Sequence, residues 1–444
     1  MLEGWNHPER LKNVVEDVLK EAIRQGASGA EVDIGLNKGF SVTSRMGDVE
    51  SVEYNQDKII EMTVYFGKRT GAASLSDLRP DAIQSAVKAA CNIARFGDQD
   101  ECAGLAPKDR LAFDYPELNL SFPWAISVEE AIALTRECEG IALSSDKRIQ
   151  NSEGASLSTT AGWHAYGNTE GFIGVQAATR HDISCALIAK EGEDMQRDYN
   201  YTVSCDPALL ESIEWVANTA VQKTIRRLNA RQLSTRKVPV IFIAEEARGL
   251  LGHFVAAISG GNLYRKSSFL VDHLGKAVFP SHIQLDERPH LMKSLGSASF
   301  DDNGVATRPN IFIENGLLRS YCLGVYSARK LGMETTGNAG GVHNLFINTG
   351  TKDLSALLKT MDTGLLVTDL MGQGINLVTG DYSRGAAGFW VEGGTIQYPV
   401  EEITIAGNLR DIYANLVEVG ADVDQRGNIQ TGSILIESMT VAGD

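Results

Sequence analysis

Runs in which apolar and polar residues alternate fill much of the first half of the chain, and this alternation limits the choice of fold. A helical pattern from Leu11 to Ile23 comes first, runs such as AEVDIGL and IIEMTVYFG follow, and a second helix is predicted over residues 80–96. Alternation of this kind buries one face of each strand, as in an antiparallel meander. The sequence therefore predicts an α+β fold class, with an N-terminal domain of helices and antiparallel sheet.

The same order of helix, meander and helix recurs further along the chain. Ser127 and Glu130 have the spacing of a capping box. Runs such as FIGVQAATRH follow, and Asp206 with Pro207 is expected to open a helix that ends near Leu228. The recurrence predicts an N-terminal α+β domain over residues 1–230 with a weak helix-meander-helix duplication.

A polar and basic stretch, RRLNARQLSTRKVP at residues 226–239, predicts the domain boundary. Its five basic residues are interpreted as a solvated linker, and a nucleic-acid patch is the less favoured alternative. Residues 236–444 are rich in glycine and short strands, with a hairpin turn expected at Asn315 and Gly316. They are predicted to form a C-terminal β-rich domain, a sandwich or a barrel with a few helices.

Charge and cysteine usage argue against several classes of function. Lys and Arg total 41 against 57 Asp and Glu, and the net charge of -16 disfavours binding to nucleic acid or to an anionic membrane surface. The six cysteines form no C-x-x-C pair, which is typical of reduced thiols in a cytosol. The charged N-terminus lacks the apolar core of a signal peptide, and no apolar run is long enough to span a bilayer. The predicted localisation is cytoplasmic.

The stretch GLLGHFVAAISGG, residues 249–261, predicts a helix with one apolar face and one nearly bare face, on which His253 is the one large polar group. The other residues expected on the bare face are small: Gly249, Gly252, Ala256, Ala257 and Gly260. A helical zinc site needs a second ligand about one turn later, where this chain has Ala257. Because the other histidines are dispersed, His253 is interpreted as a packing or hydrogen-bonding residue and not as a metal ligand.

Glycine-rich stretches at residues 371–394 and 336–344 invite a nucleotide-binding reading, but their spacing argues against it. The first lacks the Gly-Lys-Ser/Thr end of a P-loop, and a strand-like run follows its G-x-G where a dinucleotide turn needs a helix. Polar residues among these glycines are better interpreted as donors to a bound peptide. With the helix, they give eight peptide-cleft candidates: His253, Gly260, Arg265, His343, Asn344, Asp381, Tyr382 and Arg384.

Three stretches together resemble the TldD/PmbA family of metallopeptidases, and within it the PmbA branch, also called TldE. They are GLLGHFVAAISGGNLYRKSSFL, TTGNAGGVHN and GDYSRGAAGFWVEGGTIQYPVEEITIAGNL, and SRMGDVESVEYN near the front adds to them. The resemblance runs along the full length of the chain, and the long C-terminal stretch is specific.

The resemblance implies that the metal chemistry belongs to a partner. In the TldD branch the helix carries a His-Glu-x-x-x-His motif, in which two histidines bind zinc and the glutamate is the general base, and a cysteine near the C-terminus completes the site. Gly252, His253 and Ala257 stand at those positions here, and the last cysteine is Cys322. The resemblance therefore implies no catalytic residue and no metal ligand in this chain, and zinc in a TldD-type subunit that forms a heterodimer with it.

The predicted function is proteolysis of unfolded or small peptides by that complex, with this chain forming part of the cleft wall. Two alternatives stay open at this point. One is a peptidase that is active alone through an unrecognised site, and the other is a peptide-binding regulatory protein without hydrolytic activity. Whether the chain is itself an enzyme, and whether it forms a homodimer without its partner, does not follow from the sequence.

Overall fold

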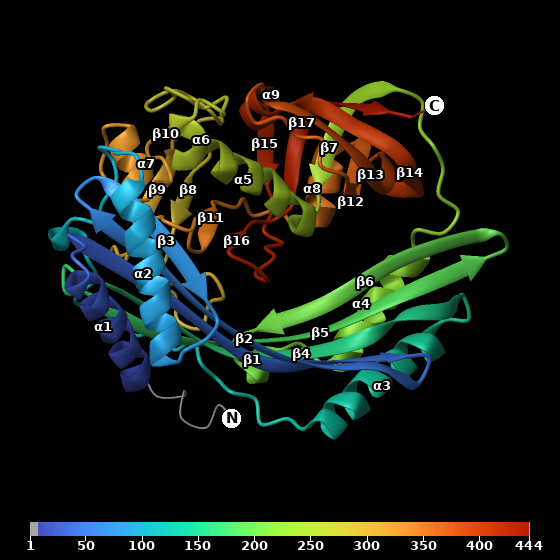
Figure 1. Cartoon of the computed structure of the whole chain (residues 1–444). Helices are drawn as coiled ribbons and strands as arrows, with labels where there is room; N and C mark the ends of the chain where they lie inside the picture. The colour runs from blue at the N-terminus through green and yellow to red at the C-terminus, as the bar shows by residue number, and fades with distance from the viewer. Residues whose placement is uncertain (1–7, 444) are drawn as a thin grey trace.

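A long antiparallel sheet forms one layer of the molecule, and a β-rich part lies over one of its faces (Figure 1). The structure, a computed structural model, describes residues 8–443. Part of the N-terminal segment considered for a signal peptide, with His7, therefore lies outside the described residues. The mixture of helices and mainly antiparallel sheets confirms the predicted α+β fold class.

The long sheet has the strand order β3-β2-β1-β4-β5-β6, and its central strands β1 and β4 pair antiparallel. Each of these two strands begins the sheet of one unit, and both units have the same order of helix, three strands and helix. The first unit consists of α1 (Pro8–Arg24), β1 (Gly29–Arg45), β2 (Asp48–Phe66), β3 (Arg69–Leu75) and α2 (Pro80–Phe96). The second consists of α3 (Val128–Ser145), β4 (Ile149–Asn168), β5 (Ile173–Glu191), β6 (Asp194–Ser204) and α4 (Ile213–Ile225).

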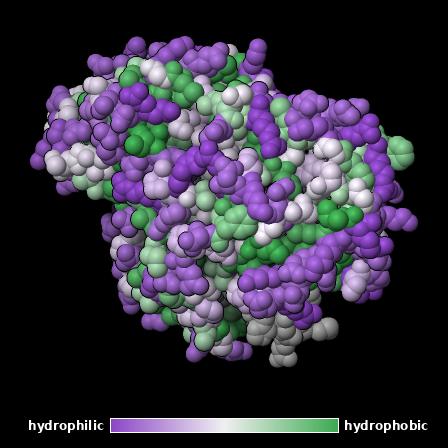
Figure 2. All heavy atoms as spheres, turned by 90° about the vertical axis from the view of Figure 1, so that its left-hand side faces the viewer, coloured by the Kyte–Doolittle hydropathy of each residue, from purple (hydrophilic) through white to green (hydrophobic). Residues whose placement is uncertain are grey.

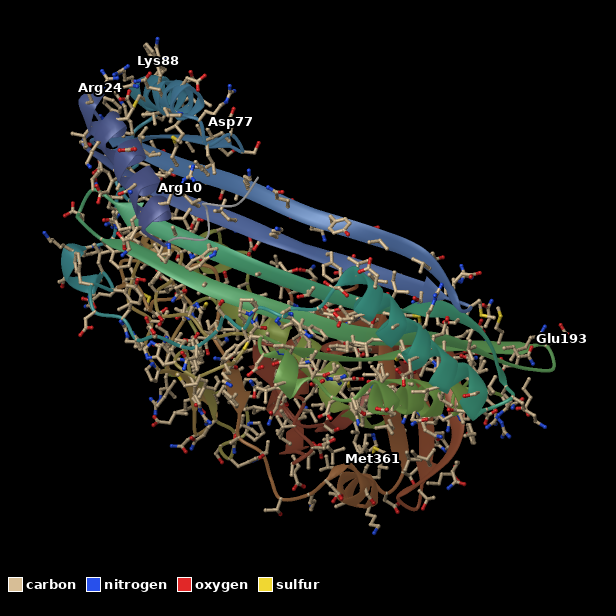
Figure 3. All side chains as sticks on the ribbon, turned by 90° about the horizontal axis from the view of Figure 1, so that it is seen from below. Arg10, Arg24, Asp77, Lys88, Glu193 and Met361 are labelled. Atoms are coloured by element: carbon tan, nitrogen blue, oxygen red, sulfur yellow. The ribbon has the colours of Figure 1, made fainter. Side chains whose placement is uncertain are left out.

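The helices pack against the strands of their own unit, but α1 also contacts β4 and β5, and α3 also contacts β1. The buried side chains of α1, among them Leu11 and Val15, pack with those of α2 and of β1 and β2 in one core, and α3 and α4 share a second core with β4 and β5. Seen from below, α1 and α2, marked by Arg10 and Lys88, lie at one end of the sheet, and Glu193 marks the opposite end (Figure 3). The helices thus lie toward the two ends of the sheet and also join the two units across the central strands.

The sequence predicts some helix starts correctly and one incorrectly. The capping box of α3 is confirmed, because Ser127 and Glu130 exchange side-chain and backbone hydrogen bonds. The predicted start of the next helix at Asp206 is wrong, since Asp206 caps only a short 3-10 turn. Helix α4 begins later, where the Ser212 hydroxyl accepts a hydrogen bond from the backbone N–H of Trp215. The cap at Ser212, which directly precedes the helical residues, therefore sets the start of α4.

The C-terminal part contains a closed sheet and a smaller open one. The larger sheet has the order β14-β13-β12-β7-β17-β15, and an additional pairing between β14 and β17 closes five of its strands into a barrel. The smaller has the order β10-β9-β8-β11-β16, and the turn at Asn315 and Gly316 joins β9 to β10 as predicted. The barrel confirms the predicted architecture of this part.

The elements of the C-terminal part are short, with the exception of α5, β13 and β14. The strands are β7 (Arg236–Phe242), β8 (Leu285–Glu287), β9 (Asn310–Glu314), β10 (Leu317–Leu318), β11 (Leu345–Ile347), β12 (Gly364–Met371), β13 (Asp381–Glu392), β14 (Thr395–Asn408), β15 (Leu416–Val419), β16 (Ile429–Gln430) and β17 (Ile434–Ala442). The helices are α5 (Ala244–Ile258), α6 (Gly260–Tyr264), α7 (Val325–Lys330), α8 (Leu354–Met361) and α9 (Leu409–Ala414).

The basic stretch before β7 is held on the C-terminal sheet by its arginines. The guanidinium groups of Arg226, Arg231 and Arg236 lie over the rings of Phe389, Tyr398 and Trp390, at 5.1, 4.6 and 5.0 Å from the ring centroids. Cation–π contacts of this kind stabilise the position of a linker without removing it from water. Three of the five basic residues of this stretch therefore have intramolecular ring contacts.

The surface is mostly hydrophilic on the side seen in Figure 2, with apolar residues in smaller patches. Within residues 8–443, no helix combines the length and the apolar character needed to cross a membrane.

Candidate functional site

Helix α5 carries the candidate site, and its apolar face fixes it in the C-terminal core. Leu250, Leu251 and Phe254 of this face are at most 2% exposed. The ring of Phe254 meets those of Phe279 and Tyr413 edge-on, at centroid distances of 5.4 and 6.1 Å. The helix follows β7 after a single residue and also contacts β12 and β16, so it lies where the two C-terminal sheets meet.

The opposite face of α5 is open around its glycines. A Cβ atom added at Gly249 would meet no heavy atom within 4 Å, and one added at Gly252 would meet only Ile429, at 4.0 Å. Ala257 and Gly260 were expected on this face, but both are buried. The reason at Gly260 is close packing on α7, because a Cβ there would lie 2.3 Å from Ser327 Oγ. The bare face is therefore real but shorter than the sequence predicts.

At the edge of this bare face, His253, Tyr382 and Arg384 lie together. The rings of His253 and Tyr382 are 6.0 Å apart in a T-shaped arrangement, and Tyr382 and Arg384 are alternate residues on the same side of β13. Burial, and then the nearby Arg384 guanidinium, lower the pKa of His253. Burial raises the pKa of Tyr382 to about 12. At neutral pH the cluster thus consists of a neutral imidazole, a protonated phenol and a cation.

These three side chains are short of hydrogen-bond partners. His253 Nε2, Tyr382 Oη and Arg384 Nε are buried polar atoms for which the structure gives no partner among the described residues. The fourth such atom is Asn200 Nδ2, which belongs to β6. Buried polar groups are almost always paired in folded proteins. Three unpaired atoms in one cluster therefore mark this place as functional more strongly than any single residue does.

Glu246 is a member of this region that sequence reasoning missed. It lies on the same side of α5 as His253, seven residues earlier, and burial followed by the nearby Asp369 raises its pKa to about 7. Asp369 itself pairs with Arg227 at 3.0 Å. Acidic residues are common in a first helical turn because they interact favourably with the helix dipole, so no local pattern singles out Glu246.

The other five candidates lie apart from this cluster. Gly260 packs against α7, as described above, and Arg265 is exposed with its guanidinium 5.1 Å from the ring centroid of Tyr264. His343 Nδ1 lies 3.2 Å from the buried carboxylate of Glu287. Asn344 is fully buried, with its amide bonded to Arg288 and to Ser297, and Asp381 is exposed and accepts bonds from Thr379 and Asn408. Of the eight candidates, the structure brings His253, Tyr382 and Arg384 together.

A cavity of about 910 Å³ lies beside the first turn of α5. Its walls come from β6 and α4 on one side and from the start of α5 and residues 422–426 on the other, and the unpartnered amide of Asn200 is part of the lining. Glu245 reaches it in a network with Lys223, at 2.7 Å, and with Arg426. None of the eight candidates lines it, because its walls are distant in sequence and no local motif marks them.

The residues of α5 do not fit a zinc site. Zinc in proteins takes Cys, His, Asp or Glu ligands in a tetrahedral arrangement. The residue before His253 is Gly252 and the residue one turn after it is Ala257, and neither has a side chain that can bind a metal. Burial raises the pKa of the Cys322 thiol, which opposes formation of the thiolate that binds metals. The part of the chain that the structure describes holds no group of three or more potential ligands placed to bind a metal ion.

Comparison with known proteins places the chain in a family. Models described as PmbA/TldA metallopeptidase domain 1, central domain and C-terminal domain match residues 30–94, 122–228 and 235–443. The chain belongs to the PmbA/TldD metallopeptidase family. It is 48% identical to metalloprotease PmbA of Escherichia coli O157:H7 over 98% of this chain and 97% of that protein, and 48% identical to a PmbA homologue of Haemophilus influenzae over the same shares.

Two solved structures have the same fold as this chain. A proposed modulator of DNA gyrase from Bacteroides thetaiotaomicron has a TM-score of 0.92 at 25% identity, with all of both chains covered. TldE from Thermococcus kodakarensis has a TM-score of 0.82 at 22% identity over 97% of this chain and all of that one. A TldD homologue from Buchnera aphidicola is 21% identical over 89% of this chain and 88% of that protein. The identities confirm the resemblance to the PmbA branch.

Proposed function

We propose that this chain is a peptide-binding subunit of a TldD-type metallopeptidase complex and that its partner holds the zinc. The observation that carries the proposal is helix α5, which keeps an open face beside a cluster of unpaired polar atoms but has Gly252 and Ala257 where the TldD motif has histidines. The chain binds and positions peptide, and the hydrolytic step takes place on the partner.

A bare helical face and an adjoining cavity suit an extended, unfolded peptide. Extended peptides are held mainly through their main chain, so they need close approach to a surface with few large side chains. The open space at Gly249 permits that approach, and the cavity beside Glu245 adds room of the size that proteins use for ligands. These features favour unstructured peptides over folded proteins as substrates.

A free strand edge supports the existence of a partner chain. Strand β3 pairs with β2 only from Ile60 onward, so among the described residues no strand covers the outer edge of residues 48–59. Apolar side chains on this segment are exposed, and Tyr54 is 74% exposed. Long exposed edges are usually covered or blocked in stable proteins. We place the partner on this edge.

Adding this chain to a TldD-type protein is expected to raise cleavage of an unstructured fluorogenic peptide at least about tenfold, since a subunit that positions substrate contributes effects of that size or larger. Tyr54→Lys should weaken this activation about tenfold at limiting concentration because a charge then enters the interface. Phe96→Lys is the matched control, since Phe96 is a 90% exposed aromatic residue on α2, and it should leave activation unchanged.

The other outcomes distinguish the remaining functions. Cleavage by this chain alone would contradict the proposal and favour an independent peptidase. Peptide binding without any effect on the TldD-type protein would favour a regulatory peptide-binding protein. An unchanged activation by the Tyr54 variant would leave the subunit role intact and would move the interface away from β2. Cytoplasmic localisation stays a prediction.

A further inference from the structure

We infer that the cluster of His253, Tyr382 and Arg384, hereafter the α5–β13 cluster, binds a carboxylate group of the peptide. The inference rests on the proposed function, because it gives the chemistry of one end of the peptide cleft. It adds a specific anion-binding place to a cleft that otherwise recognises main chain.

The first observation is the set of unpaired donors. Tyr382 is 1% exposed, and its hydroxyl has no hydrogen-bond partner among the described residues. Arg384 uses one terminal nitrogen to donate to the carbonyl of Leu370 at 3.0 Å, while its Nε is unpaired. His253 Nε2 is unpaired in the same way. The cluster therefore presents unused hydrogen-bonding atoms from two elements, α5 and β13.

The second observation is an unpaired charge. Arg384 is half-buried, and no ion pair within residues 8–443 includes it. Burial of a cation without a partner costs free energy that a bound anion recovers. A neutral carbonyl oxygen would satisfy a donor but would leave this charge unbalanced. A carboxylate satisfies both, and guanidinium groups bind carboxylates with two parallel hydrogen bonds when the geometry permits.

Two acidic groups near the cluster leave the positive charge of Arg384 without an ion-pair partner. Glu246 interacts electrostatically with Asp369 and with Arg384, but neither acidic group forms an ion pair with Arg384. Because the pKa of Glu246 is about 7, its carboxyl is half protonated at neutral pH and carries only part of a charge. Burial is the main cause of the lowered pKa of His253, and the positive charge of Arg384 adds to it.

Access to the cluster is from the bare face of α5. His253 and Arg384 are each half-buried, so part of each side chain is in contact with solvent while the unpaired atoms are closed. The space above Gly249 is open, one turn before His253. Entry of a carboxylate requires the imidazole, whose ring centroid lies 6.0 Å from that of Tyr382, to move, and the open space at Gly249 gives it room.

Binding of matched peptides to the full chain tests the inference. The probes are an acetylated octapeptide of alternating alanine and serine with a free C-terminus, the same peptide with a C-terminal amide, and amidated versions with one central glutamate or glutamine. In a calorimetric titration the peptides with a carboxylate should bind about ten- to hundredfold more tightly than their neutral counterparts. The free-terminus pair and the glutamate pair separate the two sources of the carboxylate.

Variants assign that preference to the cluster. Arg384→Met should abolish it, and Tyr382→Phe, which removes only an unpaired hydroxyl, should reduce it severalfold with the fold intact. Ser383→Ala is the matched control, because Ser383 is exposed between these residues on β13, and it should change nothing. Equal binding of acid and amide peptides would overturn the carboxylate site and leave the proposed function standing. Failure of every probe to bind would overturn both the carboxylate site and the proposed function. A preference for carboxylate peptides that survives in Arg384→Met would overturn the site alone.

Discussion

Replacing Glu287 with alanine is expected to lower the free energy of unfolding by about 3 to 5 kcal/mol, because it removes several hydrogen bonds to a buried charged group, each contributing about 1.5 to 3 kcal/mol. The Glu287 carboxylate is 1% exposed and accepts hydrogen bonds from the side-chain amides of Asn310 and Asn338 at 2.7 and 2.8 Å, and from the backbone N–H of His343. Its removal leaves the backbone N–H of His343 without this acceptor, and the two amides are left with their bonds of 3.1 Å to Thr336, Asn338 Oδ1 and Gly341. Urea unfolding followed by circular dichroism measures the change.

The neighbouring residue provides the control for Glu287. Asp286 pairs with Arg288 at 2.6 Å, but both side chains are substantially exposed, at 33% and 52%. Surface pairs of this kind contribute about 0.5 kcal/mol or less, so Asp286→Ala should unfold at nearly the wild-type urea concentration. Equal effects of the two variants would show that the Glu287 network does not hold β8, β9 and the loop before β11 together.

Phe254→Ala is expected to destabilise the protein by about 3 to 5 kcal/mol, in the range measured for buried phenylalanines. Its side chain is fully buried between Phe279, Tyr413 and the core of the C-terminal sheets, so alanine leaves a cavity under α5. Thermal and urea unfolding measure the loss. Because α5 also carries the candidate cleft, peptide binding should weaken in this variant as the helix loses its packing against the core.

The adjacent functional residue should behave in the opposite way. His253→Ala removes a half-buried ring whose Nε2 is unpaired, so stability should change by about 1 kcal/mol or less while carboxylate binding falls. A large loss of stability in His253→Ala would instead assign the histidine a structural role. The contrast between positions 253 and 254 separates the two faces of one helix.

Local patterns account for the parts of the fold that the sequence predicts. The capping box at Ser127, the turn at Asn315 and Gly316 and the bounds of α2 depend on residues close in sequence, and the structure confirms them. The predicted helix start at Asp206 is wrong because Asp206 and Ser212 are both possible caps, and local sequence does not show which of them begins the helix. The closure of the barrel by β14 and β17 joins segments far apart and carries no local signal.

The candidate site divides in the same way. Residues on one face of α5 follow from helical periodicity, so the open space at Gly249 and the place of His253 could be predicted. The association of His253 with Tyr382 and Arg384 depends on how α5 packs on β13, and the role of Glu246 depends on burial and on Asp369. The cavity beside α5 has walls from many separate segments, which include residues 291–295 as well as β6, α4, the start of α5 and residues 422–426. Such features arise only when tertiary packing is known.

Zinc content measured by mass spectrometry tests the central claim most directly. The purified chain, the TldD-type protein and their complex are each equilibrated with zinc and freed of excess metal before measurement. We predict substoichiometric zinc in this chain alone and about one zinc per pair in the complex, held by ligands that Gly252 and Ala257 cannot supply. About one tightly bound zinc in the chain alone, accompanied by cleavage of an unstructured peptide, would contradict it.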